Sequence, residues 1–209
     1  MISTSIGFLM MAIAVGGVLY FQWPKQPGDI HRLSPLATST ASAYVSPPLQ
    51  ANIEPVSETL SSNNTFEVRL SVTVPRIGSN PEAEITLTLS AEGVVQIVGH
   101  ADWSIDRFEP GRAEDFTATV AVTGYGEGTL KLQAHTFDAT GRKLWGKADD
   151  LFVLHTPDDF LLGKSSLFDL KREMLSRIPM SPAEYEKQMR NLLEGKELLF
   201  ERQIRALQK

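Results

Sequence analysis

The sequence predicts a mainly β protein, in which an antiparallel β-sandwich follows a single N-terminal transmembrane helix and precedes a C-terminal helical tail. Residues 66–74 alternate strictly between apolar and polar side chains, the pattern of a strand with one buried face. Residues 6–23 are almost all apolar or small, and beyond residue 157 apolar side chains recur every three or four positions, as in helices. The chain therefore divides into a transmembrane anchor (1–23), a Pro/Ser/Thr-rich linker (24–64), the sandwich (65–156) and a two-helix amphipathic tail (157–209).

The composition excludes several classes of function. The 209 residues carry a net charge of −5, so the chain has no overall basic footprint for nucleic acid, and no nucleic-acid partner is expected. Cysteine is absent, which excludes disulfides, zinc sites built from thiolates and cysteine nucleophiles. A segment of about ninety residues is long enough to bury its own core, so the sandwich is expected to fold as a unit.

The apolar run at the N-terminus has nearly the length of a membrane-spanning helix, about 17–25 residues. Tyr20, Phe21 and Trp23 cluster at its end, where amphipathic rings favour the membrane interface. A cleaved signal peptide is the competing interpretation. Residues 1–5 lack its basic side chains, and the nearest good cleavage site, at 41–43, lies about twenty residues too far along. We therefore expect an uncleaved, single-pass anchor.

Two features of the following segment point to opposite orientations. Lys25 and Arg32 would place that side in the cytoplasm by the positive-inside rule. A sandwich carried on a stalk rich in Pro, Ser and Thr is instead typical of envelope proteins, and long trailing domains are translocated largely regardless of charge. We expect the bulk of the chain to be extracytoplasmic (periplasmic). The stalk itself should be a semi-extended tether, because proline fixes φ and has no backbone N–H to donate. Its prolines are Pro24, Pro27, Pro35, Pro47, Pro48 and Pro55.

The sandwich is predicted from several short alternating segments separated by turn residues. Apolar residues alternate with polar ones in 85–89, 116–122 and 130–134, and Trp103 and Ile105 suggest a further short strand. The segments 109–112, 124–128 and 138–141 contain Gly, Pro or Asp at positions that favour turns.

The turn Glu109-Pro110-Gly111-Arg112, followed by the strand 116–122, a Gly-rich turn and another strand, resembles bacterial immunoglobulin-like and fibronectin type III modules of envelope proteins. The resemblance covers less than half of the chain and implies an Ig-like sandwich. It implies no particular activity, because this superfold hosts many functions, and the paired cysteines of true immunoglobulin domains are missing here.

The tail is predicted to form two helices. The first begins after Ser165 or Ser166 and ends before Pro179, while Ser181-Pro182-Ala183-Glu184 starts a second that could continue nearly to Lys209. Gly195 and Lys196 interrupt its middle. The apolar side chains of this second helix form a stripe, which we predict to bind a partner: Tyr185, Met189, Leu192, Leu193, Leu199, Phe200, Ile204 and Leu207.

This tail stripe needs a cover, and three covers remain open from the sequence: the chain's own sandwich, a sister chain or another protein. A lipid surface is disfavoured, because the acidic and basic residues of the tail are interleaved and nearly balanced. Asp158 and Asp159, followed by Phe160-Leu161-Leu162, are expected to form a first helical turn; a partner-docking peptide is the alternative.

Candidate chemistry is sparse. His100, Asp102 and Asp106 lie near one another in the sequence, as do His135 and Asp138, but a metal site needs three or more converging ligands. We expect structural roles for them, with no metal and no cofactor. The Gly-rich segment 124–128 lacks the Gly-Lys-Ser/Thr ending of a phosphate loop and is expected to be a hairpin turn. No catalytic residue is assigned.

Four aromatic residues, Trp103, Phe108, Tyr125 and Trp145, could form a platform for carbohydrate. The alternative that we favour is that Trp103 and Trp145 fill the core. The expected function is therefore that of a non-catalytic, single-pass membrane accessory or scaffold subunit. It would help to assemble or stabilise a larger membrane protein complex, either energy-transducing (respiratory or photosynthetic) or an envelope machine. The alternative function is a membrane-tethered module that binds carbohydrate or another envelope ligand.

Overall fold

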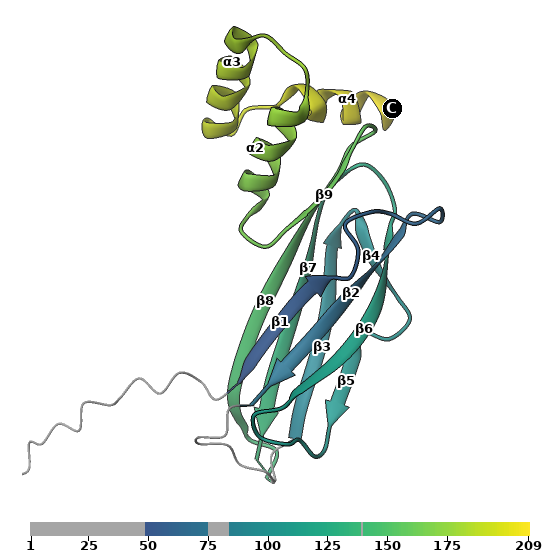
Figure 1. Ribbon diagram of the computed structural model, residues 1–209, viewed down its shortest axis with the longest axis vertical. Coiled ribbons are helices and arrows are strands. Elements are labelled where there is room, and N and C mark those ends of the chain that lie inside the picture. The colour runs from purple at the N-terminus through teal and green to yellow at the C-terminus, as the bar shows by residue number, and fades with distance from the viewer. Residues whose placement is uncertain (1–48, 75–83, 139) are drawn as a thin grey trace, which may run out of the picture. The chain divides into compact units, whose positions relative to one another are not determined.

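A computed structural model describes residues 49–74, 84–138 and 140–209 of this protein. They form a mainly β structure with two antiparallel sheets and a C-terminal helical region, which confirms the coarse fold class (Figure 1). The predicted anchor, with Tyr20, Phe21 and Trp23, lies outside the described residues, as does most of the predicted linker. Within the described ranges, every helix is too short or too polar to span a bilayer.

The two sheets draw their strands from different parts of the sequence. Sheet A has the order β1 (Gln50–Pro55), β2 (Thr65–Thr73), β6 (Ala113–Val122) and β4 (Val95–Val98). Sheet B has the order β5 (Asp102–Ile105), β3 (Glu84–Gly93), β7 (Gly126–Phe137), β8 (Lys143–His155) and β9 (Phe160–Gly163). Neighbouring strands are antiparallel throughout.

The sandwich core forms where the alternating patterns of both sheets face each other. In β2, Phe66, Val68, Leu70 and Val72 are buried while the residues between them are partly or fully exposed, as the alternation predicted. Sheet B contributes a comparable set of fully buried residues, namely Ile85, Leu87, Leu130, Leu132, Leu151 and Val153. Each such side chain contributes about 1.5–3 kcal/mol by leaving water.

Strand β1 lies inside the range predicted as linker, so the sandwich begins at Gln50 and not at residue 65. Ala51 and Ile53 are buried, and β1 pairs along its whole length with β2. The strand is also tied to sheet B, because the backbone N–H of Ile53 donates to Asp149 (2.9 Å), and Lys164 donates to both Asn52 and Asp149. The prediction failed because the prolines on either side of this short alternation favour a linker.

The Gly-rich segment 124–128 connects the two sheets and is not the predicted hairpin turn, since β6 belongs to sheet A and β7 to sheet B. A second crossing, at Gly93, leads from β3 to β4 and lies against the first. Gly93 has a φ of +76°, and a Cβ at this position would stand 2.1 Å from the carbonyl oxygen of Glu127. Only glycine allows the two crossings to approach this closely.

The helical region contains α2 (Leu167–Arg177), α3 (Pro182–Leu193) and α4 (Leu199–Leu207), where two helices were predicted. Both predicted N-caps are confirmed, because Ser166 accepts from the N–H of Asp169 and Ser181 from that of Glu184. The long second helix is interrupted at Gly195, whose φ is +64°. A glycine in this conformation commonly ends a helix, so α4 starts anew after it.

The segment predicted as a first helical turn is a turn followed by a strand. Thr156 holds the turn, since its hydroxyl accepts from the N–H of Asp159 (3.0 Å). Residues 160–163 then pair with the end of β8 as β9, with Phe160 opposite His155. The composition of residues 160–162 is compatible with a helix or a strand. They form a strand because they pair with the free edge of β8.

Candidate functional site

The described residues contain no group of three or more His, Cys, Asp or Glu side chains that could hold a metal ion. Asp138 instead shapes the β7–β8 turn, where its carboxylate accepts from the backbone N–H groups of Thr140 and Arg142 (2.9 Å each). His135 lies beside Lys143, with 3.2 Å between the two side-chain nitrogens. The candidate functional surface lies in the helical region, where two leucines of the tail stripe are exposed.

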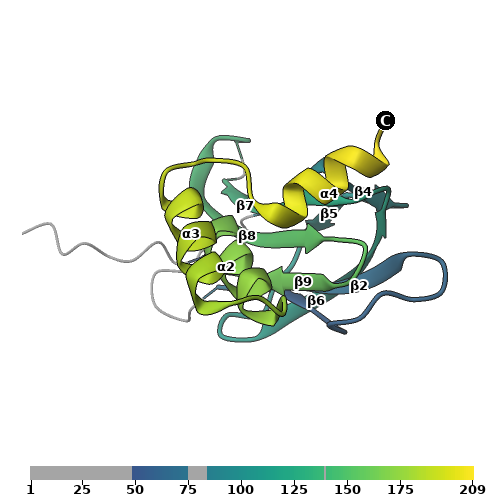
Figure 2. The same cartoon turned by 90° about the horizontal axis from the view of Figure 1, so that it is seen from above.

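We call α2, α3 and α4 the helical cap, because they pack on one end of the sandwich (Figures 1 and 2). Figure 2 shows α2 and α3 side by side, with α4 to one side of them and running away toward the C-terminus. The cap has a core of its own, shared with the ends of β8 and β9. Its buried residues are Leu154, Leu161, Leu170, Met174, Leu175, Leu192, Leu198, Phe200 and Ile204.

The tail stripe is divided between internal packing and the surface. Leu192, Phe200 and Ile204 are buried in the core of the cap, and Tyr185, Met189 and Leu199 are partly buried. Leu193 and Leu207 remain exposed, by 71% and 60%. The sandwich and the other helices of the cap thus cover most of the stripe. A cover by the chain's own sandwich was one of the three possibilities that the sequence left open. Two leucines of the stripe remain uncovered.

One further exposed apolar residue of the cap was missed by the sequence reasoning. Phe168, on α2, is 37% exposed. It lies between the half-buried Leu167 and the buried Leu170. Because three apolar residues stand so close together in the sequence, the sequence alone does not indicate which of them is exposed. Phe168, Leu193 and Leu207 place one exposed apolar side chain on each of the three helices.

A network of charged groups holds α2, α4 and the start of β7 together. The ammonium of Lys171 binds Glu127 (2.6 Å) and Glu201 (2.7 Å), and Glu201 also accepts from the N–H of Leu198 (2.8 Å). Burial alone would lower the pKa of Lys171, but the hydrogen bonds to both carboxylates outweigh it and raise this pKa above its ordinary value. At the far end of α4, Gln208 donates to the carbonyl of Tyr125 (3.2 Å).

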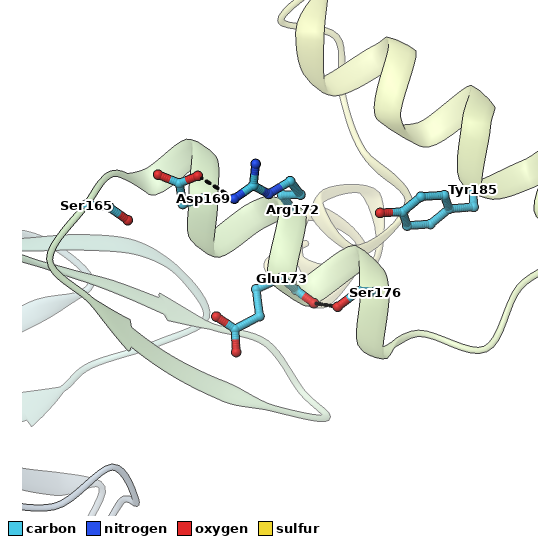
Figure 3. Close-up of a pocket in the computed structure, with 6 residues that line it drawn as sticks. All are labelled: Ser165, Asp169, Arg172, Glu173, Ser176 and Tyr185. Carbon is cyan, nitrogen blue, oxygen red and sulfur yellow. Dashed lines mark hydrogen bonds and ion pairs between the residues drawn. The ribbon is translucent and has the colours of Figure 1, made fainter.

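A polar pocket of about 650 Å³ lies beside α2 and α3 and is shown in Figure 3. Its charged groups are paired: Arg172 binds Asp169 (2.9 Å), and Glu173 binds Arg177 (2.6 Å), which lies outside the lining. Ser176 donates to the backbone carbonyl of Glu173 (2.7 Å). Tyr185 points its hydroxyl from α3 toward α2. Hydrogen bonds from Ser166 and Ser165, together with the nearby Arg172, lower the pKa of Asp169. Both acids of the lining are held in ion pairs, so neither is a free general base, and we assign no chemistry to this pocket.

The four aromatic residues do not gather on one surface. Trp103 and Phe108 pack against the sandwich core, and the ring of Trp103 lies tilted against that of Phe116 with centroids 5.9 Å apart. The ring of Tyr125 lies tilted against that of His155 near the cap, with centroids 4.8 Å apart. Trp145 pairs with Thr136 near the other end of β7, about 30 Å away at the rise of a strand.

The expected core role of Trp145 is wrong, since this residue is 41% exposed. It stands in the inward-facing row of Ile105, Ile85 and Thr136, but on β8, at the end of that row. A core position therefore depends on what the opposite sheet covers, which the local sequence does not contain.

No protein-family model and no curated protein sequence matches this chain. Two solved structures of alpha-2-macroglobulin from Escherichia coli are similar to parts of it. The cryo-EM structure of the native conformation shares 18% identity over 49% of this chain and 6% of that chain, with a TM-score of 0.36. The crystal structure spanning domain MG7 to the C-terminus shares 14% identity over 77% of this chain and 32% of that chain, with a TM-score of 0.40.

Proposed function

We propose that this protein is a non-catalytic, single-pass membrane accessory subunit that helps to assemble or stabilise a larger membrane protein complex. In this proposal the apolar run 6–23 anchors the chain and the bulk is extracytoplasmic. The sandwich is of the Ig-like type, with a four-stranded and a five-stranded antiparallel sheet face to face. The sandwich and the helical cap supply the contact surface.

The observation that carries the proposal is the division of the tail stripe. The cap already buries its own core, yet Leu193 and Leu207 are 71% and 60% exposed, and Phe168 adds a third apolar side chain. A single exposed apolar side chain is ordinary, but one on each helix of the same small cap gives a partner several apolar anchor points.

The test is gentle extraction of the full-length protein from its native membrane, followed by mass spectrometry of the proteins that co-purify. We expect stoichiometric membrane partners with the natural chain, and at least tenfold less of them with the double variant Leu193→Glu and Leu207→Glu, because a buried unpaired carboxylate is strongly unfavourable at an interface. The control is Ala183→Glu with Gln203→Glu, which adds the same charge at exposed positions of α3 and α4. A natural chain that migrates as a lone monomer would refute the proposal.

The alternative, a carbohydrate-binding module, has no supporting arrangement in the described residues. A sugar platform needs aromatic faces close together, whereas Tyr125 and Trp145 lie near opposite ends of β7. We therefore do not propose it.

A further inference from the structure

A groove of about 680 Å³ lies where the sandwich meets the helical cap, apart from the exposed residues Phe168, Leu193 and Leu207. The loop after β1 forms one wall with Glu58, Thr59 and Leu60. The turn 156–159, strand β9 and the last turns of α2 form the other walls. Its size is that of clefts that take a small ligand or a short stretch of peptide.

The groove has an apolar wall. Leu60, Phe160 and Leu162 line it, and all three are partly buried against the sandwich core. The ring of Phe160 is fixed between Phe66 and His155, at centroid distances of 5.4 Å and 6.0 Å. His155 is itself held in place, because its Nδ1 hydrogen-bonds with the carbonyl of Gly124 (2.7 Å). A ligand that enters the groove therefore meets a rigid aromatic and aliphatic surface.

The charge of the groove is strongly one-sided. Four carboxylates line it, those of Glu58, Asp158, Asp159 and Glu173, and they face a single guanidinium, that of Arg177. Arg177 is already bound by Asp159 (2.8 Å) and Glu173 (2.6 Å). Both hydrogen bonds raise the pKa of Arg177, so its charge is committed to these two acids.

Glu58 and Asp158 are the acids left over. Both are exposed, and among the described residues neither has an ion-pair partner. Most carboxylates of the cap are paired instead: Asp169 with Arg172, Glu184 with Lys187, Glu194 with Lys196, Glu197 with Arg205, and Glu201 with Lys171. Two unpaired acids in the lining of one groove create a negative potential beside its apolar wall.

We infer that this groove binds a basic segment of a partner protein, an extended stretch in which Arg or Lys alternates with apolar residues. This inference rests on the proposed function. The cationic heads pair with Glu58 and Asp158, with bidentate geometry in the case of Arg. The aliphatic stems and the apolar residues pack on Leu60, Phe160 and Leu162. Anionic partners, such as nucleic acid or an acidic lipid headgroup, are repelled by the same charge.

The first experiment measures binding of two labelled peptides to the full-length protein in detergent by fluorescence anisotropy. The probe is acetyl-Arg-Leu-Arg-Leu-Arg-amide, and acetyl-Glu-Leu-Glu-Leu-Glu-amide is its acidic counterpart. We expect only the basic peptide to bind, and at least tenfold more weakly to the variant Glu58→Gln with Asp158→Asn, because two charge-assisted contacts are lost.

The matched control is Glu92→Gln with Glu186→Gln, which removes the same two charges at exposed positions outside the groove. This variant should bind the basic peptide like the natural chain. Equal affinity of both variants for the basic peptide would overturn the inference, since binding would then follow net charge alone. Thermal unfolding of each variant confirms that the fold is retained.

A second experiment separates this inference from the proposed function. The groove variant is extracted from the native membrane beside the natural chain and beside the variant Leu193→Glu with Leu207→Glu. Loss of the co-purifying partner from the groove variant supports the inference. Full retention of a partner by the groove variant overturns the inference and leaves the subunit function standing, whereas absence of any partner from the natural chain overturns both.

Discussion

At the residue scale, Phe200 and Leu207 lie on the same helix and differ in what they do. Phe200 is 1% exposed in the core of the cap, and Leu207 is 60% exposed. We expect Phe200→Ala to lower the free energy of unfolding by about 3–5 kcal/mol, because it leaves a cavity. Leu207→Ala should stay within about 0.5 kcal/mol of the natural chain. Urea denaturation measures both, and equal effects would contradict the assigned packing of α4.

Asp138 makes the β7–β8 turn sensitive to acid. Hydrogen bonds from the hydroxyl of Thr140 and the backbone of Arg142 lower the pKa of this carboxyl below its ordinary value of 3.8. A lowered pKa means that the carboxylate stabilises the fold above the ordinary pKa, and that this contribution is lost as the pH falls through the folded-state pKa.

We therefore expect Asp138→Asn to be less stable than the natural chain at neutral pH, with a difference that shrinks as the pH falls below 3.8. Denaturation midpoints of both proteins across this range give the measurement. Asp106→Asn serves as the control, because within the described part of the chain the exposed Asp106 accepts from the hydroxyl of Ser104 and from no backbone N–H. A difference that is independent of pH would show that the charge of Asp138 is not what stabilises the turn.

At the scale of elements, Gly93 and Gly99 separate backbone strain from steric conflict. Both have positive φ, +76° and +94°, but only Gly93 faces a close neighbour, the carbonyl oxygen of Glu127. We expect Gly99→Ala to cost about 1 kcal/mol of stability, from the backbone alone. Gly93→Ala should cost clearly more, since the two crossings between the sheets must then move apart. Comparable thermal unfolding of the two variants would argue against the close approach.

The sequence predicts elements well where one period continues over many residues. Strand β2 and the starts of α2 and α3 follow directly from alternation and from Ser166 and Ser181. Strands β1 and β9 are short, and the Pro or Asp residues beside them favour a linker or a helix start. They are strands because they pair with β2 and β8, which the local sequence does not indicate. The segments at Gly93 and at 124–128 cross from one sheet to the other. Their Gly-rich sequences would suit a hairpin turn equally well, so only the strand topology shows that they connect two sheets.

The candidate surfaces were predictable only in part. The helical period identified the tail stripe, but it does not say which members the cap itself buries, and Leu193 and Leu207 stand out only after packing. The acidic groove was not predictable, since Glu58 and Asp158 are a hundred positions apart and meet through the fold. A partial signal was present, because neither acid has a Lys or Arg within four positions along the chain.

At the scale of the whole molecule, Lys171 links the cap to the sandwich. It joins α2 to Glu127 at the start of β7 and to Glu201 on α4. We expect Lys171→Met to speed amide hydrogen exchange in residues 199–207, because two carboxylates then lose their shared cation and α4 opens more often. Arg172→Met is the control, since Arg172 binds a single acid among the described residues, Asp169 of its own helix. Unchanged exchange in α4 would show that Phe200 and Ile204 hold this helix without the ion pairs.

The contact between Gln208 and Tyr125 joins residues 83 positions apart, and it has a kinetic consequence. Every strand of both sheets precedes α4 in the sequence, so the residues of α4 that lie beside Leu154 and Tyr125 are synthesised after all of these strands. Domains that depend on such distant contacts fold slowly, on a scale of about milliseconds to seconds. During synthesis, the apolar end of the sandwich is thus the surface that a chaperone would meet.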